Sequence, residues 1–353
     1  MNRKKFLGSL TLLSVLPSAA LTKSKDIPGQ FSESVKTIKP KRLKEGDTLG
    51  IICPGSFITE EELNDTIENI SKLGFKAKYS NNVLAKKGYL AGEDKLRTDD
   101  LNNMFEDDEV NGIICARGGY GCARILPYID YSIIKNNPKV IFGYSDITAL
   151  LIAIYKKTGL VCFHGPVGIS TFNEFSTKYF RNVLMETPNE LELISEILEE
   201  KSDDLAYAID IISEGSAEGL LTGGNLSIVA SLMGTPYEID LAGKILFLEE
   251  VGEEPYRIDR MLTQILMSGN IDKLKGIALG VFSDCESDET NPGFDESFTL
   301  KEVLLDRLAK LGIPVIYGLS FGHVSNKFTL PLGVNAKLDT DTKSLFLLES
   351  SVQ

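Results

Sequence analysis

A serine stands where the chain could present a nucleophile. The apolar run Val140–Phe142 leads into Gly-Tyr-Ser-Asp at 143–146, and a segment with helical periodicity follows at once. At such a strand-to-helix turn the hydroxyl of Ser145 is lifted clear of the sheet. The backbone N–H of Asp146 and the helix dipole can then stabilise an oxyanion. Only part of the pattern G-x-S-x-G is present, because Ile147 replaces its second glycine. The alternative to a catalytic role is that the side chain of Ser145 or Asp146 simply caps the following helix.

Ser145 needs a general base, and the chain has only two histidines. His164 lies in Phe-His-Gly-Pro, and His323 lies in Phe-Gly-His. A lone histidine is often a buried structural residue, so the residue types alone leave both candidates open.

A carboxylate could orient either imidazole, and four glutamates follow the strand-like run Lys244–Leu248. Neighbouring residues of a strand face opposite sides, so the first two of these glutamates cannot both point at one histidine. The candidates are Glu249, Glu250, Glu253 and Glu254.

Glycines and arginines supply candidate ligand contacts. The loop Arg117–Gly121 follows the strand-like run Gly112–Ala116, so it belongs at the carboxyl edge of a parallel sheet, where ligands bind in α/β folds. It matches neither a dinucleotide fingerprint nor a P-loop, and its glycines could simply form a tight turn. Arg257 and Arg260 are spaced to share a helix face and could hold a carboxylate; a solvated basic edge beside acidic neighbours is the alternative.

Composition narrows the function classes. The 353 residues are 43% hydrophobic and 25% charged, which is typical of a soluble globular enzyme. A net charge of −13 argues against a nucleic-acid partner. Two histidines and five cysteines, without C-x-x-C or H-E-x-x-H spacing, leave too few ligands for a zinc site. The chemistry is therefore expected to be metal-free or carboxylate-based, and we expect no cofactor. The odd thiol count and apolar surroundings predict buried cysteines rather than disulfides.

Short apolar runs alternate with helix-period segments from about Asp47 to about residue 190, which predicts an α/β domain with a parallel, flavodoxin- or Rossmann-like sheet. A mixed α+β domain is expected after residue 216, with the active site between the two domains. The predicted organisation is a signal peptide over 1–20, a linker over 21–43, the first domain over 44–190, a linker over 191–215 and the second domain over 216–353. The strands expected in the first domain are Thr48–Cys53, Lys76–Tyr79, Gly112–Ala116, Val140–Tyr144 and Leu160–Phe163. The second domain is expected to contain the strands Lys244–Leu248, Gly276–Phe282, Val315–Tyr317, Lys327–Leu330 and Ser344–Leu348.

The N-terminus has the layout of an export signal. Arg3-Lys4-Lys5 precedes the apolar stretch Phe6–Leu16, and small residues follow at 18–20. The basic start is similar to a twin-arginine signal with one lysine substituted. We therefore expect export to the periplasm with no stable membrane insertion after cleavage, and a cytoplasmic location is the alternative. An apolar N-terminal helix packed on the fold is the other interpretation of the stretch.

In this order and spacing, several motifs resemble the LD-carboxypeptidase family of serine peptidases. The likeness runs from about Leu43 to about Leu347. The motifs that carry it are Ala116–Gly121, Gly143–Asp146, Gly223–Leu226, Leu248–Glu250, Tyr256–Leu262, Gly322-His323 and Leu330–Gly333.

The resemblance implies a metal-free Ser-His-Glu mechanism divided between two domains. Carried onto this chain, Ser145 matches the nucleophile, Glu249 the orienting carboxylate and His323 the base. His164 would then be a structural residue or would support the catalytic residues from behind. The backbone N–H groups of Gly118 and Asp146 match the oxyanion donors. The candidate substrate-binding residues are Arg117, Tyr120, Asn225 and Arg257.

The implied reaction is release of the terminal D-Ala from a muropeptide tetrapeptide stem. The expected binding partner is a muropeptide or a peptidoglycan stem peptide. The resemblance also implies that the protein forms a homodimer. A related microcin C self-immunity protein cleaves aminoacyl-adenylate analogues, which is the first alternative. Adenine recognition there depends on aromatic stacking, whereas this chain has no Trp and its acidic loop Ser283–Ser297 offers only Phe294. A non-catalytic peptidoglycan-binding protein, or an exported nucleotide- or sugar-binding protein, is the remaining alternative.

Overall fold

The computed structural model describes residues 36–186, 188–196, 207–268, 270–287 and 293–353. The predicted signal peptide and residues 21–35 of the predicted linker lie outside these ranges. The described part of that linker packs on the fold. Ile38 forms a bridge with Leu160, and the Leu43 side chain is buried.

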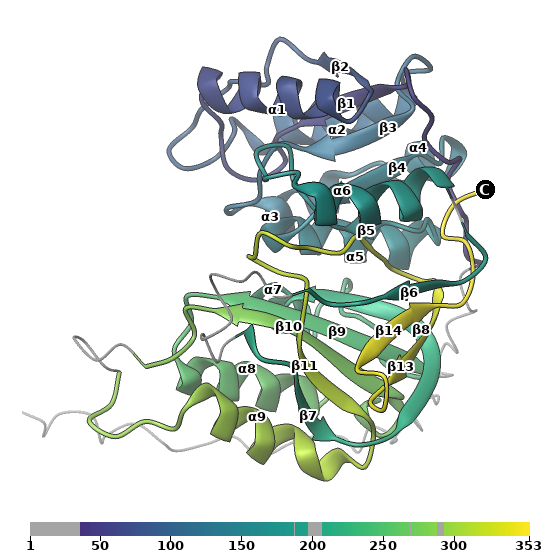
Figure 1. Cartoon of the computed structure of the whole chain (residues 1–353). Helices are drawn as coiled ribbons and strands as arrows, with labels where there is room; N and C mark the ends of the chain where they lie inside the picture. Colours follow the sequence, from purple (N-terminus) through teal and green to yellow (C-terminus); the bar gives the residue numbers. More distant parts are fainter. Residues whose placement is uncertain (1–35, 187, 197–206, 269, 288–292) are drawn as a thin grey trace, which may run out of the picture. The chain divides into compact units, whose positions relative to one another are not determined.

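Two sheets form the described structure (Figure 1). The first has the strand order β2-β1-β3-β4-β5-β12, in which the first five strands are parallel and β12 is antiparallel to β5. The order 2-1-3-4-5 is that of flavodoxin-like folds, so the predicted fold class is confirmed. Its strands are β1 (Thr48–Ile52), β2 (Lys76–Tyr79), β3 (Gly112–Cys115), β4 (Val140–Gly143), β5 (Phe163–His164) and β12 (Leu330–Pro331).

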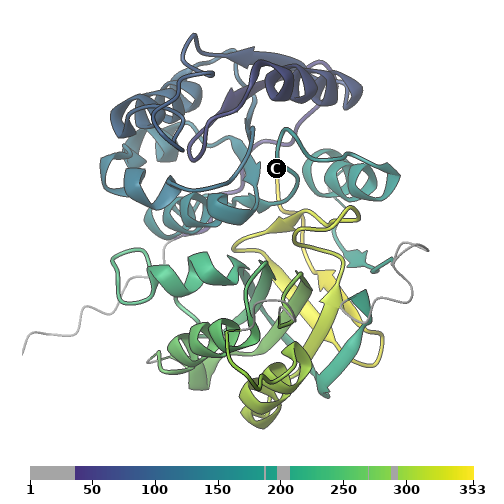
Figure 2. The same cartoon turned by 90° about the vertical axis from the view of Figure 1, so that its left-hand side faces the viewer.

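Helices cover both faces of the first sheet. Along one face α4 contacts both α2 and α5, and α1 and α6 lie over the other face (Figures 1 and 2). Helix α1 begins at a capping box, in which the Thr59 hydroxyl accepts from the Glu62 N–H and the Glu62 carboxylate accepts from the Thr59 N–H. The helices are α1 (Glu60–Lys72), α2 (Asp94–Glu106), α3 (Cys122–Ile125), α4 (Tyr131–Asn136), α5 (Thr148–Thr158) and α6 (Glu174–Arg181).

The second sheet is mixed, as predicted. Its order is β6-β14-β13-β8-β9-β10-β11-β7, with β8 to β11 parallel and the others antiparallel. Helices α7 (Leu226–Leu232), α8 (Pro255–Leu266) and α9 (Leu300–Leu308) contact one another in that order. The strands are β6 (Leu191–Leu193), β7 (Asp210–Ser213), β8 (Ser216–Asn225), β9 (Lys244–Val251), β10 (Gly276–Ser283), β11 (Val315–Leu319), β13 (Asn335–Asp339) and β14 (Ser344–Leu347).

Two predictions about connections are wrong. Residues 191–215 were expected to be a linker, but they supply β6 and β7, the two edge strands of the second sheet. The run Lys327–Leu330 was expected to be a strand of the second domain, but β12 begins at Leu330 and pairs with His164 in the first sheet. Both segments are too short for periodicity to reveal their partners, which tertiary packing determines.

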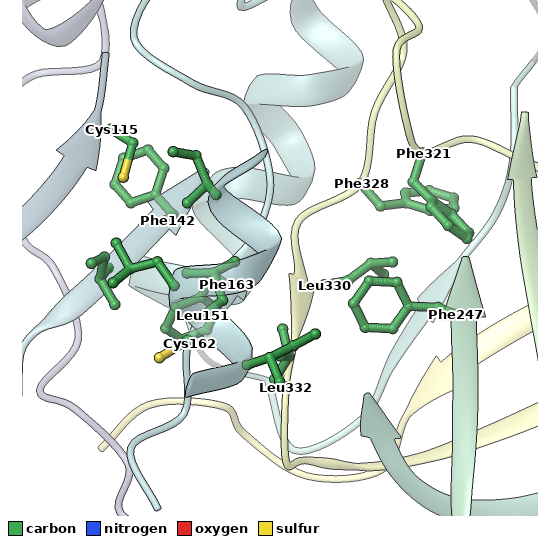
Figure 3. Packing of buried hydrophobic residues seen from close by; sticks show 14 of the residues in the cluster. Cys115, Phe142, Leu151, Cys162, Phe163, Phe247, Phe321, Phe328, Leu330 and Leu332 are labelled. Atoms are coloured by element: carbon green, nitrogen blue, oxygen red, sulfur yellow. The ribbon is translucent and has the colours of Figure 1, made fainter. Parts of the chain in front are cut away.

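One hydrophobic core runs through both sheets. Figure 3 shows Phe163 on the side of the first sheet and Phe247 on the side of the second, with Leu330 and Leu332 between them. All four side chains are fully buried, and burial of a phenylalanine or leucine contributes roughly 1.5–3 kcal/mol. The chain return through β12 therefore ties the two sheets together.

All five cysteines are buried and free, as predicted. Burial raises the pKa of the Cys53 thiol to about 12 and raises the pKa of Cys115 and Cys122 well above the usual value. These thiols are therefore held in the unreactive protonated form. None of the helices in the described ranges combines the length and apolar character that a bilayer span requires.

Candidate active site

Ser145 lies directly after β4, at the start of a 3-10 turn that leads into α5. Its φ is 64°, in the left-handed region that non-glycine residues rarely adopt and that costs about 1–2 kcal/mol. Neither proposed cap is made, because no side-chain cap hydrogen bond begins this turn or α5. The Asp146 carboxylate instead accepts a 2.9 Å hydrogen bond from the Cys122 N–H at the start of α3. The strained turn leaves the serine side chain free of a capping role.

The loop after β3 approaches this turn closely. A Cβ on Gly118 would lie 3.0 Å from the Ser145 Cβ and 3.3 Å from the Asp146 nitrogen. Only glycine fits without displacement of the turn. Arg97, whose side chain is buried, donates to the carbonyl oxygens of Pro54 and Gly121 and so holds the far end of the loop. The residues predicted to supply the oxyanion donors, Gly118 and Asp146, are thus adjacent.

His323 and Glu249 form a hydrogen bond of 2.8 Å between Nδ1 and Oε2. Glu249 lies at the carboxyl end of β9 and is fully buried, whereas the His323 side chain is 21% exposed. Gly322 has a φ of 111°, and a Cβ there would lie 2.9 Å from the Glu249 Cβ. The glycine therefore permits the close approach of the histidine loop to β9.

Burial alone would raise the pKa of the Glu249 carboxyl. The hydrogen bond and charge of His323, with smaller contributions from His164 and Asn225, instead hold this pKa below its usual value. Glu249 is therefore a carboxylate near neutral pH, which lets it accept a hydrogen bond from Nδ1–H and leaves Nε2 as the nitrogen free to act as a base.

A cavity of about 590 Å³ brings these groups to one place. Its lining includes Gly118 and Ser145 from the first sheet, and His323 and Lys327 from the segment between β11 and β12. The Tyr144 ring lies edge-on to the His323 ring at 4.8 Å, so the base is next to the serine turn. Nucleophile, base and buried carboxylate are the groups that acyl transfer through a covalent intermediate requires.

The two halves of the cavity are docked through α5 and β8. The Asn225 N–H at the end of β8 donates to the Thr148 hydroxyl in the first turn of α5, over 3.0 Å. A Cβ on Gly224 would overlap this hydroxyl at 2.5 Å. This contact holds the Ser145 turn, at the start of α5, against β8, which is the neighbour of β9 in the second sheet.

Sequence comparison supports the same chemistry. Residues 49–165 match the LD-carboxypeptidase N-terminal domain, and residues 218–338 match the LD-carboxypeptidase C-terminal domain. The chain is 38% identical over 311 residues to "Probable murein peptide carboxypeptidase" of Bacillus subtilis, an alignment that covers 87% of this chain and 93% of the relative. The chain belongs to the LD-carboxypeptidase family.

Solved structures agree with this assignment. A muramoyltetrapeptide carboxypeptidase from Oxalobacter formigenes has a TM-score of 0.72 at 29% identity, with 85% of this chain and 97% of that chain covered. An MccF-like protein from Bacillus anthracis has a TM-score of 0.77 at 29% identity, with 89% of this chain and 100% of that chain covered. Both sheets of this LD-carboxypeptidase family member therefore have counterparts in the relatives.

Glu250 belongs to a different hydrogen-bond network from the Glu249–His323 pair. Glu250 accepts hydrogen bonds from the Asn225 side chain at 3.0 Å and from the N–H groups of Ser227 and Val251 at 2.7 and 2.9 Å. The prediction that adjacent glutamates diverge is confirmed. The Asn225 side chain also caps α7 by accepting from the Ile228 N–H, and Asn225 is not part of the cavity lining. Asn225 thus has a structural role at the start of α7, and its contact with substrate stays a prediction.

The other histidine, His164, is buried between the rings of Tyr144 and Phe247, at 6.2 and 5.3 Å. Within the described ranges neither ring nitrogen has a hydrogen-bond partner. Burial lowers the pKa of His164 to about 4, so the imidazole is neutral near pH 7. It does not line the cavity, which fits the structural part expected for it.

Three residues proposed for substrate binding divide into two groups. Arg117 lines the cavity, but its guanidinium already forms a 3.0 Å ion pair with Glu62. Tyr120 is 54% exposed and packs edge-on against another tyrosine outside the cavity lining. Arg257 is exposed on α8 and pairs with Glu253. The structure therefore does not support substrate binding by Tyr120 or Arg257, because both residues lie outside the cavity lining.

Lys327 is a charged residue of the cavity lining that the sequence motifs do not single out. It was assigned to a strand, and a single lysine in a short apolar run gives no signal of its own. Its placement depends on the crossing from β11 to β12, which only the fold reveals.

Among the described residues no group of three or more His, Cys, Asp or Glu is arranged to hold a metal ion.

Proposed function

We propose that this protein is a serine-type LD-carboxypeptidase that removes the terminal D-Ala from the tetrapeptide stem of a muropeptide. One observation carries the proposal: Ser145, on a left-handed turn, lines the same cavity as His323, whose Nδ1 is held by the buried Glu249. The names of the Bacillus subtilis and Oxalobacter formigenes relatives supply the substrate class.

The reaction follows from the geometry of the site. His323 Nε2 takes the proton of the Ser145 hydroxyl while Glu249 stabilises the imidazolium. The serine oxygen attacks the amide carbonyl before D-Ala, and the N–H groups of Gly118 and Asp146 stabilise the oxyanion. The imidazolium protonates the departing amine, which leaves an ester on Ser145. Water, activated by the same imidazole, hydrolyses the ester and restores the enzyme.

Hydrolysis of an aminoacyl-adenylate analogue is the second candidate, because the matched structures include MccF in complex with aspartyl sulfamoyl adenosine, at 26% identity and a TM-score of 0.76. The aromatic residue that could stack on adenine in the acidic loop, Phe294, packs edge-on against Tyr256 at 4.9 Å. This contact favours the peptide substrate.

Mass spectrometry of a tetrapeptide muropeptide incubated with the purified protein tests the proposal. We expect loss of a single terminal alanine, and no loss with the Ser145→Ala protein. An aminoacyl sulfamoyl adenosine is incubated in parallel. Cleavage of that compound alone would replace the first function by the second, and cleavage of neither would contradict both.

We further propose export and a homodimer, since the basic and apolar N-terminus favours a signal peptide and the family resemblance implies the dimer. N-terminal sequencing of protein recovered from the cell envelope should show a start near residue 21. Light scattering of that protein should give twice the mass of the chain. A full-length N-terminus in the cytoplasmic fraction, or a monomer mass, would contradict the respective proposal.

A further inference from the structure

Lys327 is a buried cation in the catalytic cavity. It is 6% exposed, and its Nζ lies 4.5 Å from the centroid of the Tyr144 ring. Its backbone N–H donates to the Ser176 hydroxyl of α6, and Phe328 donates to the Ser320 carbonyl, so the segment is anchored on both sides. The ammonium and the His323 ring both lie within 5 Å of the same tyrosine ring.

No carboxylate neutralises this ammonium in the part of the chain that the structure describes. The cavity's other cation, Arg117, has Glu62 as its partner, whereas Lys327 forms no ion pair. The carboxylate that acts on it is Glu249, which raises the pKa of Lys327 and whose Oε2 is bonded to His323. Burial lowers the pKa of Lys327 to about 8 against the opposing effect of Glu249. A buried unpaired cation is costly, so an anion that enters the cavity gains by pairing with it.

The substrate of a carboxypeptidase carries such an anion close to the reacting atom. Only two backbone atoms, the amide N and Cα, separate its α-carboxylate carbon from the scissile carbonyl carbon, so the two carbons are about 3–4 Å apart through space. A cation that recognises it must therefore share the cavity of the nucleophile. Lys327 meets this requirement because it, Ser145 and His323 line one cavity.

We propose that the Lys327 ammonium binds the free α-carboxylate of the residue that is released, and thereby restricts cleavage to the C-terminal amide. The inference rests on the proposed function, since it assigns a substrate group to the same site. Lys327 acts as a specificity-determining residue and takes no part in proton transfer. Tyr144 supports the ammonium through its ring face and holds it toward the serine turn.

The test compares a tetrapeptide stem that ends in free D-Ala with the same stem ending in D-Ala amide. For the wild-type protein we expect kcat/KM to favour the free acid by about 100-fold or more. Lys327→Met should lose about 100-fold on the acid and less than about 3-fold on the amide, which abolishes the preference. Lys301→Met, at an exposed lysine of α9, is the matched control and should retain the preference.

A purely structural role for Lys327 predicts a different effect of Lys327→Met on the two substrates. If the lysine only maintained Glu249 and His323, Lys327→Met would lower kcat equally on both substrates, and that result would overturn the inference. Thermal unfolding distinguishes either result from misfolding. We expect the Lys327→Met midpoint to equal or exceed that of wild type, because a buried unpaired charge is removed.

A binding measurement separates the inference from the proposed reaction. Calorimetry with the Ser145→Ala protein should show binding of the acid stem that weakens about 100-fold on addition of Lys327→Met. If this holds while wild type releases no alanine, the proposed function fails and the carboxylate site stands. If the acid and amide stems bind equally well, or neither binds, the carboxylate site is refuted.

Discussion

The two sheets contribute to the active site in different ways. The first sheet contributes backbone geometry: a left-handed serine after β4, and a glycine after β3 whose missing Cβ allows the two loops to meet. The second sheet and the segment that follows it contribute the buried charged groups Glu249 and Lys327, and the half-buried imidazole of His323. Nucleophile placement thus depends on sterics, whereas acid–base chemistry and ligand recognition depend on electrostatics.

This difference predicts distinct signatures for substitutions. In the first half, the addition of one carbon atom should alter activity without altering its pH dependence. In the second half, removal of a charge without change of shape should alter catalysis strongly. The predictions below test the distinction, from the largest expected effect to the smallest.

The largest effect belongs to the nucleophile itself. Both Ser145→Ala and Ser145→Gly should lose about 10⁴-fold or more in kcat. Their stabilities should differ, because a φ of 64° suits glycine and strains alanine. We expect the glycine variant to unfold at the higher temperature, by the equivalent of about 1 kcal/mol. Alanine release and calorimetric unfolding measure the two effects, and equal midpoints would show that the turn is not strained.

Glu249 and Glu250 form a matched pair in the second half. Glu249→Gln should lower kcat about 10³-fold, because the amide can no longer stabilise the imidazolium. Glu250→Gln replaces one acceptor by a donor facing the Ser227 N–H, so it should lose about 1–3 kcal/mol of unfolding free energy but less than about 10-fold in kcat. Denaturant unfolding and kcat of both proteins test this. A similar loss of kcat in both would refute the division between the two networks.

His164 lies where the two halves meet, and its effect should appear in stability rather than activity. Its pKa is about 4 in the folded protein against 6.5 for the free group, so the unfolded state binds more protons between these values. The contribution of the neutral His164 to the free energy of unfolding is therefore fully present above pH 6.5. It is lost as the pH falls toward 4, by roughly 3 kcal/mol in all. Urea unfolding across this range should show a steeper loss for wild type than for His164→Gln. Parallel profiles would contradict a neutral buried imidazole.

The strand-end groups of the site could be predicted from sequence because each follows a recognisable buried strand. Ser145 and Glu249 come directly after apolar runs, and the alternation of facing along β9 separates Glu249 from Glu250. The parallel order of the first sheet likewise follows from alternating strand and helix patterns. Choosing His323 over His164 required the family resemblance, since both follow a phenylalanine or glycine in short apolar segments.

The parts that could not be predicted depend on long-range pairing. Lys327 enters the cavity only because β12 returns to pair with β5, a two-residue pairing that leaves no periodic pattern. Asn225 and Arg257 stand in motifs near the site, yet one caps α7 and the other lies on an exposed helix face. Sequence motifs locate such residues near a site but do not determine which way their side chains point.

The smallest expected effect separates steric placement from stability. In Gly118→Ala the new Cβ would lie 3.0 Å from the Ser145 Cβ and 3.2 Å from the Tyr144 carbonyl oxygen, so the serine turn must shift by a few tenths of an ångström. Misplacement of this size should lower kcat about 10- to 100-fold, with an unchanged pH profile, because no charge is altered. Gly88→Ala is the control, since Gly88 has a φ of 60° and open space around it. It should lose about 1 kcal/mol of stability and retain full kcat. If Gly118→Ala retained full kcat as well, the loop after β3 would not position the serine, and the first sheet's contribution would reduce to the turn alone.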